Sequence, residues 1–247
     1  MRAPRGSGGA DGGLYIRGVC LRNGAARWVR DWIENGRGMR GKGCMNNSEK
    51  SAGATSVVAW QALLAGPGLP ELGPGPRAGV VASAVLEEAC AKALARSVGA
   101  GLAGGPPALL ARGAVLLWHD QHEAAHGIAQ EIASREGSWL HGMLHRREPD
   151  FSNAAYWYQR VGQHPAFAEL ARRAGEILEE EGEGAGGLRQ ALFRGAAWSA
   201  RGFIDACEQC AGRPAADARR RVLERIQAAE IEVFLEHVWR DGEGDGR

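Results

Sequence analysis

The chain has 247 residues, of which 45% are hydrophobic and 24% charged, and its formal net charge at pH 7 is +1. This composition is typical of a soluble globular protein, and the near-neutral balance argues against bulk electrostatic binding to nucleic acid. No apolar run approaches the ~18 residues of a membrane span, and the five cysteines, an odd number, do not indicate a disulfide framework. We therefore expect a cytoplasmic protein with neither nucleic acid nor a membrane as a partner. The oligomeric state is left open.

Residues 1–51 are predicted to be a disordered leader. Residues 1–44 carry nine Lys and Arg against three acids, and eleven of them are glycines, so the segment cannot bury enough apolar surface to fold. It lacks the apolar core of a secretory signal. A start of translation at Met45 is the interpretation that we favour for this segment.

Residues 52–241 are predicted to form one all-α domain, followed by a disordered tail at 242–247. Ala, Leu, Glu and Arg recur with helical periodicity, whereas the alternating β-branched runs of strands are missing. Cys207 and Cys210 are interpreted as core residues of a helix rather than as a redox pair. The pattern predicts a bundle of about seven to eight helices without a sheet. The predicted helices span residues 56–64, 79–97, 107–134, 139–147, 153–161, 166–180, 187–210 and 215–240.

Six of the seven histidines lie in a short stretch between residues 119 and 164. In the predicted helix 107–134, the side chains of His119, His122 and His126 fall in one stripe at the border between core and solvent. Three imidazoles at positions i, i+3 and i+7 can approach one point, as metal sites in helical bundles require. The alternative is that each histidine is a half-buried residue satisfied by its own neighbour, and we weigh the two interpretations equally.

Residues 122–126 read HEAAH, the HExxH pattern of zinc peptidases. In that pattern the two histidines bind zinc and the glutamate, here Glu123, serves as general base. A third ligand is required, and Glu148 is the candidate downstream. The extended pattern of some zinc peptidases is not met, because Ala129 and Ile132 occupy the positions of its Gly and third His. We therefore regard a zinc-peptidase function as a minor alternative.

The stretch after residue 139 adds further candidates for a site. His141 and His145 lie one helical turn apart, and Arg147, Glu148 and Asp150 follow closely. The imidazoles are candidate metal ligands, the carboxylates are candidate ligands or general bases, and the guanidinium is a candidate anion binder.

The next predicted helix carries an unusual polar face. Asn153, Trp157 and Arg160 share this face, which leads to His164. Arginine recognises carboxylates and phosphates, and aromatic walls bury planar groups, so the face is a candidate substrate-binding surface. The alternative is a buried polar network in which the arginines of this region pair with its acids and pin the helices together.

The run LHRREPDFSNAAYWYQRVGQHPAF resembles the signature of a family of helical proteins from bacteria and fungi whose function is uncharacterised. The resemblance covers roughly residues 110–240 and rests on the spacing HRRE-D-N--YW--R-G-HP. It implies an all-helical fold. It implies no activity, cofactor or catalytic residue.

Glu230 stands in an unexpected place in the last predicted helix. Together with His237, it falls in the middle of the apolar arc of that helix. A buried carboxylate costs several kcal/mol unless it is paired or bound to a metal. Its partner could be His237, an arginine of the central motif or a metal, and a private salt bridge with Arg147 is equally plausible.

Together these patterns predict a metal-dependent enzyme, a hydrolase acting on a small polar or anionic ligand. The metal would be a divalent transition metal such as zinc. The alternative is a non-catalytic ligand-binding or protein-interaction domain with a buried polar network. The predicted metal ligands are His119, His122, His126, His141 and His145. The predicted catalytic residues are Glu123, Glu148, Asp150 and Glu230, and the predicted substrate-binding residues are Arg147, Asn153, Trp157, Arg160 and His164.

A geometric expectation follows from the short connection between the predicted helices 107–134 and 139–147. The two helices should form an antiparallel hairpin that brings an imidazole nitrogen of His126 within about 6 Å of one on His141 or His145. Arg147 or Arg160 should reach the same cavity as Glu230.

Overall fold

The computed structural model describes residues 15–16, 19–20, 62–65, 68–97 and 105–244, and these residues are mostly helical. Within this part of the chain there are nine α-helices, α3 to α11, and two antiparallel ribbons of two strands each. The mostly helical fold is confirmed, whereas the expectation of no sheet is wrong. Most of the predicted leader, residues 56–61 of the first predicted helix, and residues 245–247 lie outside the described residues.

The elements have the following bounds. The helices are α3 Ser83–Ser97, α4 Pro106–Trp118, α5 His122–Glu131, α6 Arg135–Arg147, α7 Phe151–Val161, α8 Phe167–Glu181, α9 Leu188–Leu192, α10 Ala200–Cys210 and α11 Ala218–Gly244, with a 3-10 turn at Gly182–Ala185. The strands are β1 Tyr15–Ile16, β2 Val19–Cys20, β3 Phe193–Arg194 and β4 Ala197–Trp198.

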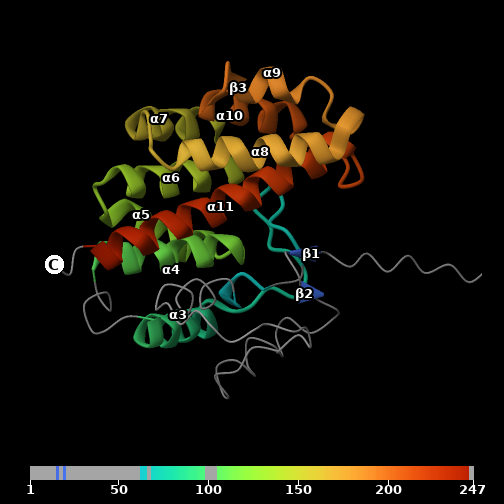
Figure 1. The fold of residues 1–247 in the computed structure, drawn as a ribbon. Helices are drawn as coiled ribbons and strands as arrows, with labels where there is room; N and C mark the ends of the chain where they lie inside the picture. Colours follow the sequence, from blue (N-terminus) through green and yellow to red (C-terminus); the bar gives the residue numbers. More distant parts are fainter. Residues whose placement is uncertain (1–14, 17–18, 21–61, 66–67, 98–104, 245–247) are drawn as a thin grey trace, which may run out of the picture.

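The long helix α11 crosses the molecule and has other helices on both sides (Figure 1). Helix α4 packs on one side of α11, and α8 packs on the other. Helices α5, α6 and α7 follow α4 in space as they do in sequence, each packing on the one before it, and α3 packs on α4. Helices α9 and α10 and the β3–β4 ribbon pack against α7 and α8.

Polar side chains cap three of these helices. Ser134 accepts a hydrogen bond from the backbone N–H of Gly137 at 3.0 Å and begins α6, and Ser199 begins α10 in the same way. Asp150 begins α7 by accepting from the N–H of Asn153 at 3.2 Å. This backbone bond holds the pKa of the Asp150 carboxyl below its usual value. The predicted catalytic residue Asp150 therefore has a structural role, because an N-terminal cap satisfies backbone donors that the helix leaves unpaired.

The predicted helix 107–134 is interrupted after Trp118. Asp120 lies in the left-handed region with φ +60°, a conformation that Asp tolerates better than most residues, and α5 starts two residues later. Its buried carboxylate accepts hydrogen bonds from Arg147 at 2.5 Å and from the side chain and backbone of Arg77 at 2.9 and 2.8 Å. Periodicity alone missed this break, because the partners of Asp120 are distant in sequence.

The predicted helix 187–210 is also divided. A tight turn with Gly195 at φ +65° joins β3 to β4, and glycine adopts this conformation without steric cost. The turn directs Trp198 into the core, where its ring lies 5.3 Å from that of Phe203, centroid to centroid. Cys207 and Cys210 are both buried on α10, and burial raises the pKa of Cys207 to about 12, which agrees with a core role.

Glu230 is fully buried and fully paired. Arg146 donates to its Oε2 at 2.5 Å, Trp139 donates to its Oε1 at 3.0 Å, and the hydroxyl of Tyr158 donates to the same oxygen. The partner of Glu230 is therefore Arg146, an arginine of the central motif as expected, whereas the alternative of a private salt bridge with Arg147 is wrong, because Arg147 pairs with Asp120. The network joins α6, α7 and α11, and it leaves the carboxylate no free oxygen for a metal or a substrate.

The pairing of Asp120 predicts a specific pH dependence of stability. Burial by itself would raise the pKa of Asp120, but the bonds from Arg147 and Arg77 outweigh it and hold the pKa below the usual value. The pair therefore stabilises the fold above the unfolded-state pKa and is lost as the pH falls through the folded-state pKa. Asp120→Asn should lower the free energy of unfolding by about 3 kcal/mol at neutral pH.

Urea denaturation from about pH 6 to about pH 3 tests this expectation. The difference in the free energy of unfolding between wild type and Asp120→Asn should become smaller as the pH falls. Glu208→Gln, at an exposed position of α10, is the control and should differ little from wild type at any pH. If the free energy of unfolding of Asp120→Asn is lower than that of wild type by the same amount at every pH, the role of the charge is contradicted.

Candidate metal centre

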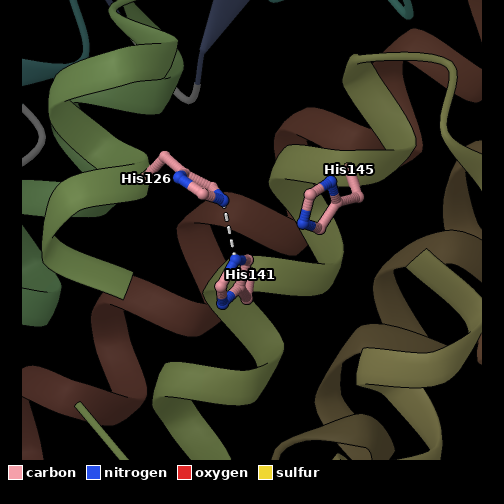
Figure 2. A group of neighbouring side chains, drawn as sticks. All are labelled: His126, His141 and His145. Atoms are coloured by element: carbon pink, nitrogen blue, oxygen red, sulfur yellow. Dashed lines mark hydrogen bonds between the residues drawn. The ribbon is translucent and has the colours of Figure 1, made fainter. Parts of the chain in front are cut away.

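Three histidines from two helices meet at one point. His126 comes from α5, and His141 and His145 come from successive turns of α6 (Figure 2). The Nε2 atoms of His126 and His141 are 2.8 Å apart, and the rings of His126 and His145 lie 5.4 Å apart, centroid to centroid. One ligand atom from each of the three residues lies within 4.8 Å of the other two. The expected approach of His126 to the later histidines is therefore confirmed.

The geometry depends on a close crossing between the end of α5 and the start of α6. Only Ile132, Ala133 and Ser134 separate the two helices. A Cβ at Gly137 would lie 1.9 Å from the carbonyl oxygen of Ile132, so a side chain there would push the two helices apart. The short link folds α6 back alongside α5, which places His141 and His145 next to His126.

Two of the three imidazoles, those of His141 and His145, are held in the neutral state. Burial, together with the neighbouring His126 and His145, lowers the pKa of His141 to about 4. Burial also lowers the pKa of His145. Neutral imidazole is the form that binds a metal, because each ring then has one nitrogen lone pair available.

Side chains around the cluster orient two of its rings. The Nδ1 atom of His145 lies 3.1 Å from Oε2 of Glu148, and its Nε2 atom lies 3.1 Å from the amide nitrogen of Asn153. With the proton of His145 on Nδ1, facing Glu148, the lone pair of Nε2 accepts the N–H of the Asn153 amide, so this amide would have to turn away before the nitrogen could bind a metal. The ring of Trp157 stacks on His141 at 4.0 Å with an interplanar angle of 13°.

A groove of about 530 Å³ lies beside the cluster. It contains two predicted catalytic carboxylates, Glu123 and Glu148, and the second of them touches His145. The volume is within the range of small-molecule sites. The residues that line the groove are Pro74, Ser83, Asp120, Gln121, His122, Glu123, Ala124 and Glu148.

His119 and His122, two of the predicted ligands, lie outside the cluster. The Nε2 atom of His119 lies 2.7 Å from the carbonyl oxygen of Leu63, and the residue is fully buried. His122 lies at the start of α5 and lines the groove. Among the described residues, the group that could hold a metal includes His126 but not His122, so the HEAAH pair does not converge as in a zinc peptidase. The break at Asp120 also removes the predicted stripe of three histidines.

The two predicted anion-binding arginines have other partners. Arg147 is fully buried and donates to Asp120 and to the carbonyl oxygens of Leu117, Glu71 and Gly73. It therefore has a structural role, because its donors are used within the protein. Arg160 is exposed and lies over the ring of Trp157 at 5.4 Å from the centroid.

A second group consists of Glu136, His164 and His237, whose ligand atoms also lie within 4.8 Å of one another. Nδ1 of His164 accepts a hydrogen bond from the backbone N–H of Ala166 at 3.2 Å, and Nε2 lies 3.4 Å from Glu136. The proton of neutral His164 is therefore on Nε2, facing Glu136, and no lone pair of this ring faces the group. Both groups have the geometry to hold a metal, and the cluster is the one made of three imidazoles.

Comparisons with known proteins add no assignment: no family model matches the chain, and neither a curated protein nor a solved structure matches it. Within the described residues, no helix has the length and apolar character needed to cross a membrane.

The close crossing at Gly137 predicts a pair of contrasting variants. Gly137→Ala should lower stability by a few kcal/mol, because its Cβ meets a backbone oxygen that no rotamer change can move. Gly127→Ala, on α5, meets nothing within 4 Å and should be neutral or stabilising by up to about 1 kcal/mol through helix propensity. Thermal denaturation of the two variants measures the contrast, and equal melting temperatures would refute the steric argument.

Proposed function

We propose that the protein is a metal-dependent enzyme, a hydrolase, whose metal is bound by His126, His141 and His145. The observation that carries this proposal is the convergence of three imidazoles, with one ligand atom of each within 4.8 Å of the others. Small rotations of the rings would bring the nitrogen atoms to the ~2.0 Å distance of zinc–histidine bonds. An imidazole-only ligand set suits zinc and neighbouring divalent transition metals.

Three features support a catalytic rather than a purely structural metal. Structural zinc sites usually have four protein ligands, whereas sites with three leave a position for water. Zinc lowers the pKa of such a water to about 7, which provides a nucleophile at neutral pH. The groove that contains Glu123 and Glu148 adjoins the cluster and gives a small substrate a place to bind. Glu123 is the exposed groove carboxylate that does not contact the cluster, and it is accessible to a substrate bound there.

The alternative is a non-catalytic domain in which the polar residues form the core. One observation favours it: the buried charges Asp120, Arg146, Arg147 and Glu230 are all paired inside the protein. Fully satisfied networks of this kind specify a core without any ligand. The alternative differs from the metal proposal in one measurable respect, since it predicts that the protein binds no metal with useful affinity.

Zinc titration against a competing chromophoric chelator tests the proposal. Wild type should bind one zinc per chain, and His126→Ala or His141→Ala should weaken binding by at least about 100-fold, because each removes a ligand. His122→Ala is the matched control: it lies on the same helix as His126 but outside the cluster, and it should change the affinity little.

Circular dichroism should show that all three variants remain helical. Absence of zinc binding by wild type would refute the metal proposal and favour the non-catalytic alternative. Equal loss of zinc in His122→Ala would instead indicate the zinc-peptidase arrangement.

The contact between Glu148 and His145 generates a second test. Glu148→Gln removes the charge that holds the His145 proton on Nδ1, so zinc affinity should fall by about 10- to 100-fold. Glu123→Gln makes the same chemical change in the same groove without touching the histidines, and it should leave zinc affinity unaltered. Identical affinities for the two variants would show that Glu148 does not orient the cluster.

A further inference from the structure

We infer that the groove beside the histidine cluster binds a cationic group of a small substrate, such as a primary ammonium. This inference rests on the proposed function and deepens it, because it names the class of substrate. Within the expected class of small polar or anionic ligands, it favours a polar ligand with a positive charge, because Arg147 is engaged elsewhere and neither Arg147 nor Arg160 lines the groove.

The charge of the groove lining carries the inference. Three of the lining residues are acidic, and none of the lining residues in the described part of the chain is Lys or Arg. The charge of Asp120 is offset by Arg77 and Arg147, which both donate to its carboxylate. The negative charges of Glu123 and Glu148 are not offset in this way, because neither carboxylate forms an ion pair with an arginine or lysine among the described residues.

The other polar lining groups fit a hydrogen-bond donor. Gln121 donates from Nε2 to the carbonyl oxygen of Val81 at 2.9 Å, which leaves its amide oxygen as an acceptor. His122 adds no positive charge, because burial, helped by the charge of Arg147, lowers its pKa to about 4. A group with several N–H donors and a positive charge therefore matches the lining better than a carboxylate or phosphate does.

One feature of the groove opposes this inference. Residues 122–124 form the first turn of α5, and no side chain caps that end of the helix. A helix N-terminus carries roughly half a positive charge and attracts anions. Glu123 lies in this first turn and Glu148 faces the same groove, so two full negative charges outweigh the partial positive one.

The position of Glu148 connects the groove to the proposed metal. Glu148 lines the groove and also lies 3.1 Å from Nδ1 of His145, one of the three histidines of the cluster. A substrate anchored by an ammonium at Glu148 and Glu123 would thus have its next bonds close to the metal. In this arrangement the groove would select substrates with an ammonium group, and the metal held by the cluster would assist cleavage of a bond near that group.

Three straight-chain four-carbon probes test the inference: the diamine, the diol and the dicarboxylate. They have the same length and differ in charge, and their binding is measured by isothermal titration calorimetry at low ionic strength, first on zinc-free and then on zinc-loaded protein. The diamine should bind at least about 10-fold more tightly than the other two, and added salt should weaken its binding.

Glu123→Gln should lower the affinity for the diamine by about 10-fold. Glu131→Gln is the matched control, because Glu131 is exposed near the other end of α5 and does not line the groove, and it should have no effect beyond about twofold. Preference for the dicarboxylate, absence of diamine binding, or an unchanged affinity in Glu123→Gln would each overturn the inference.

Measuring diamine binding and zinc binding on the same protein distinguishes a failure of this inference from a failure of the proposed function. Diamine binding by zinc-free protein that also fails to bind zinc would support the groove and refute the metal enzyme. Zinc binding without diamine binding would support the metal centre and overturn the substrate class.

Discussion

The structure depends on one buried carboxylate, Asp120, held between Arg147 and Arg77. Arg147 comes from the end of α6 and also binds the carbonyl oxygens of Glu71 and Gly73, while Arg77 binds that of Gly68 at 2.6 Å. A buried charge is costly unless it is paired with an opposite charge. Here one arginine that precedes Asp120 in the sequence, Arg77, and one that follows it, Arg147, provide the positive charge. By fixing the break between α4 and α5, this interaction places one wall of the groove and aims α5 at α6.

Two neighbouring arginines connect α6 to two different parts of the structure. Successive residues on a helix point about 100° apart, so Arg146 reaches Glu230 on α11 while Arg147 reaches Asp120 before α5. Both ion pairs are buried, and α6, which contributes the arginine to each of them, also carries His141 and His145. A helix clamped in this way has little freedom to rotate, which keeps the two imidazoles directed toward His126. The polar network and the candidate metal centre are thus connected, since the network orients the helix that carries two of the three imidazoles.

The six histidines crowded in the sequence lie in four different environments in the structure. His119 lies next to a backbone carbonyl, His122 lines the groove, His164 joins Glu136 and His237, and the other three form the cluster. The short link between two helices made the approach of His126 to His141 predictable, because a hairpin brings residues at equal distances from the turn together. The network of Arg146, Tyr158 and Trp139 around Glu230 was not predicted in detail, although the acid in an apolar arc was a correct signal of a buried partner.

By itself, the sequence determined the helical class, the approximate helix bounds, the hairpin of α5 and α6, and the burial of Glu230. All of these follow from local periodicity, chain connectivity or the cost of burying a charge. Only the tertiary structure decided which arginine pairs with which acid, where the predicted helices break, and which histidines share a point. These depend on contacts such as Arg147 with Asp120, 27 residues apart, and Arg146 with Glu230, 84 residues apart. Adjacent arginines look alike in sequence, and the partner of each one lies in a distant segment of the chain, before α6 for Arg147 and after it for Arg146.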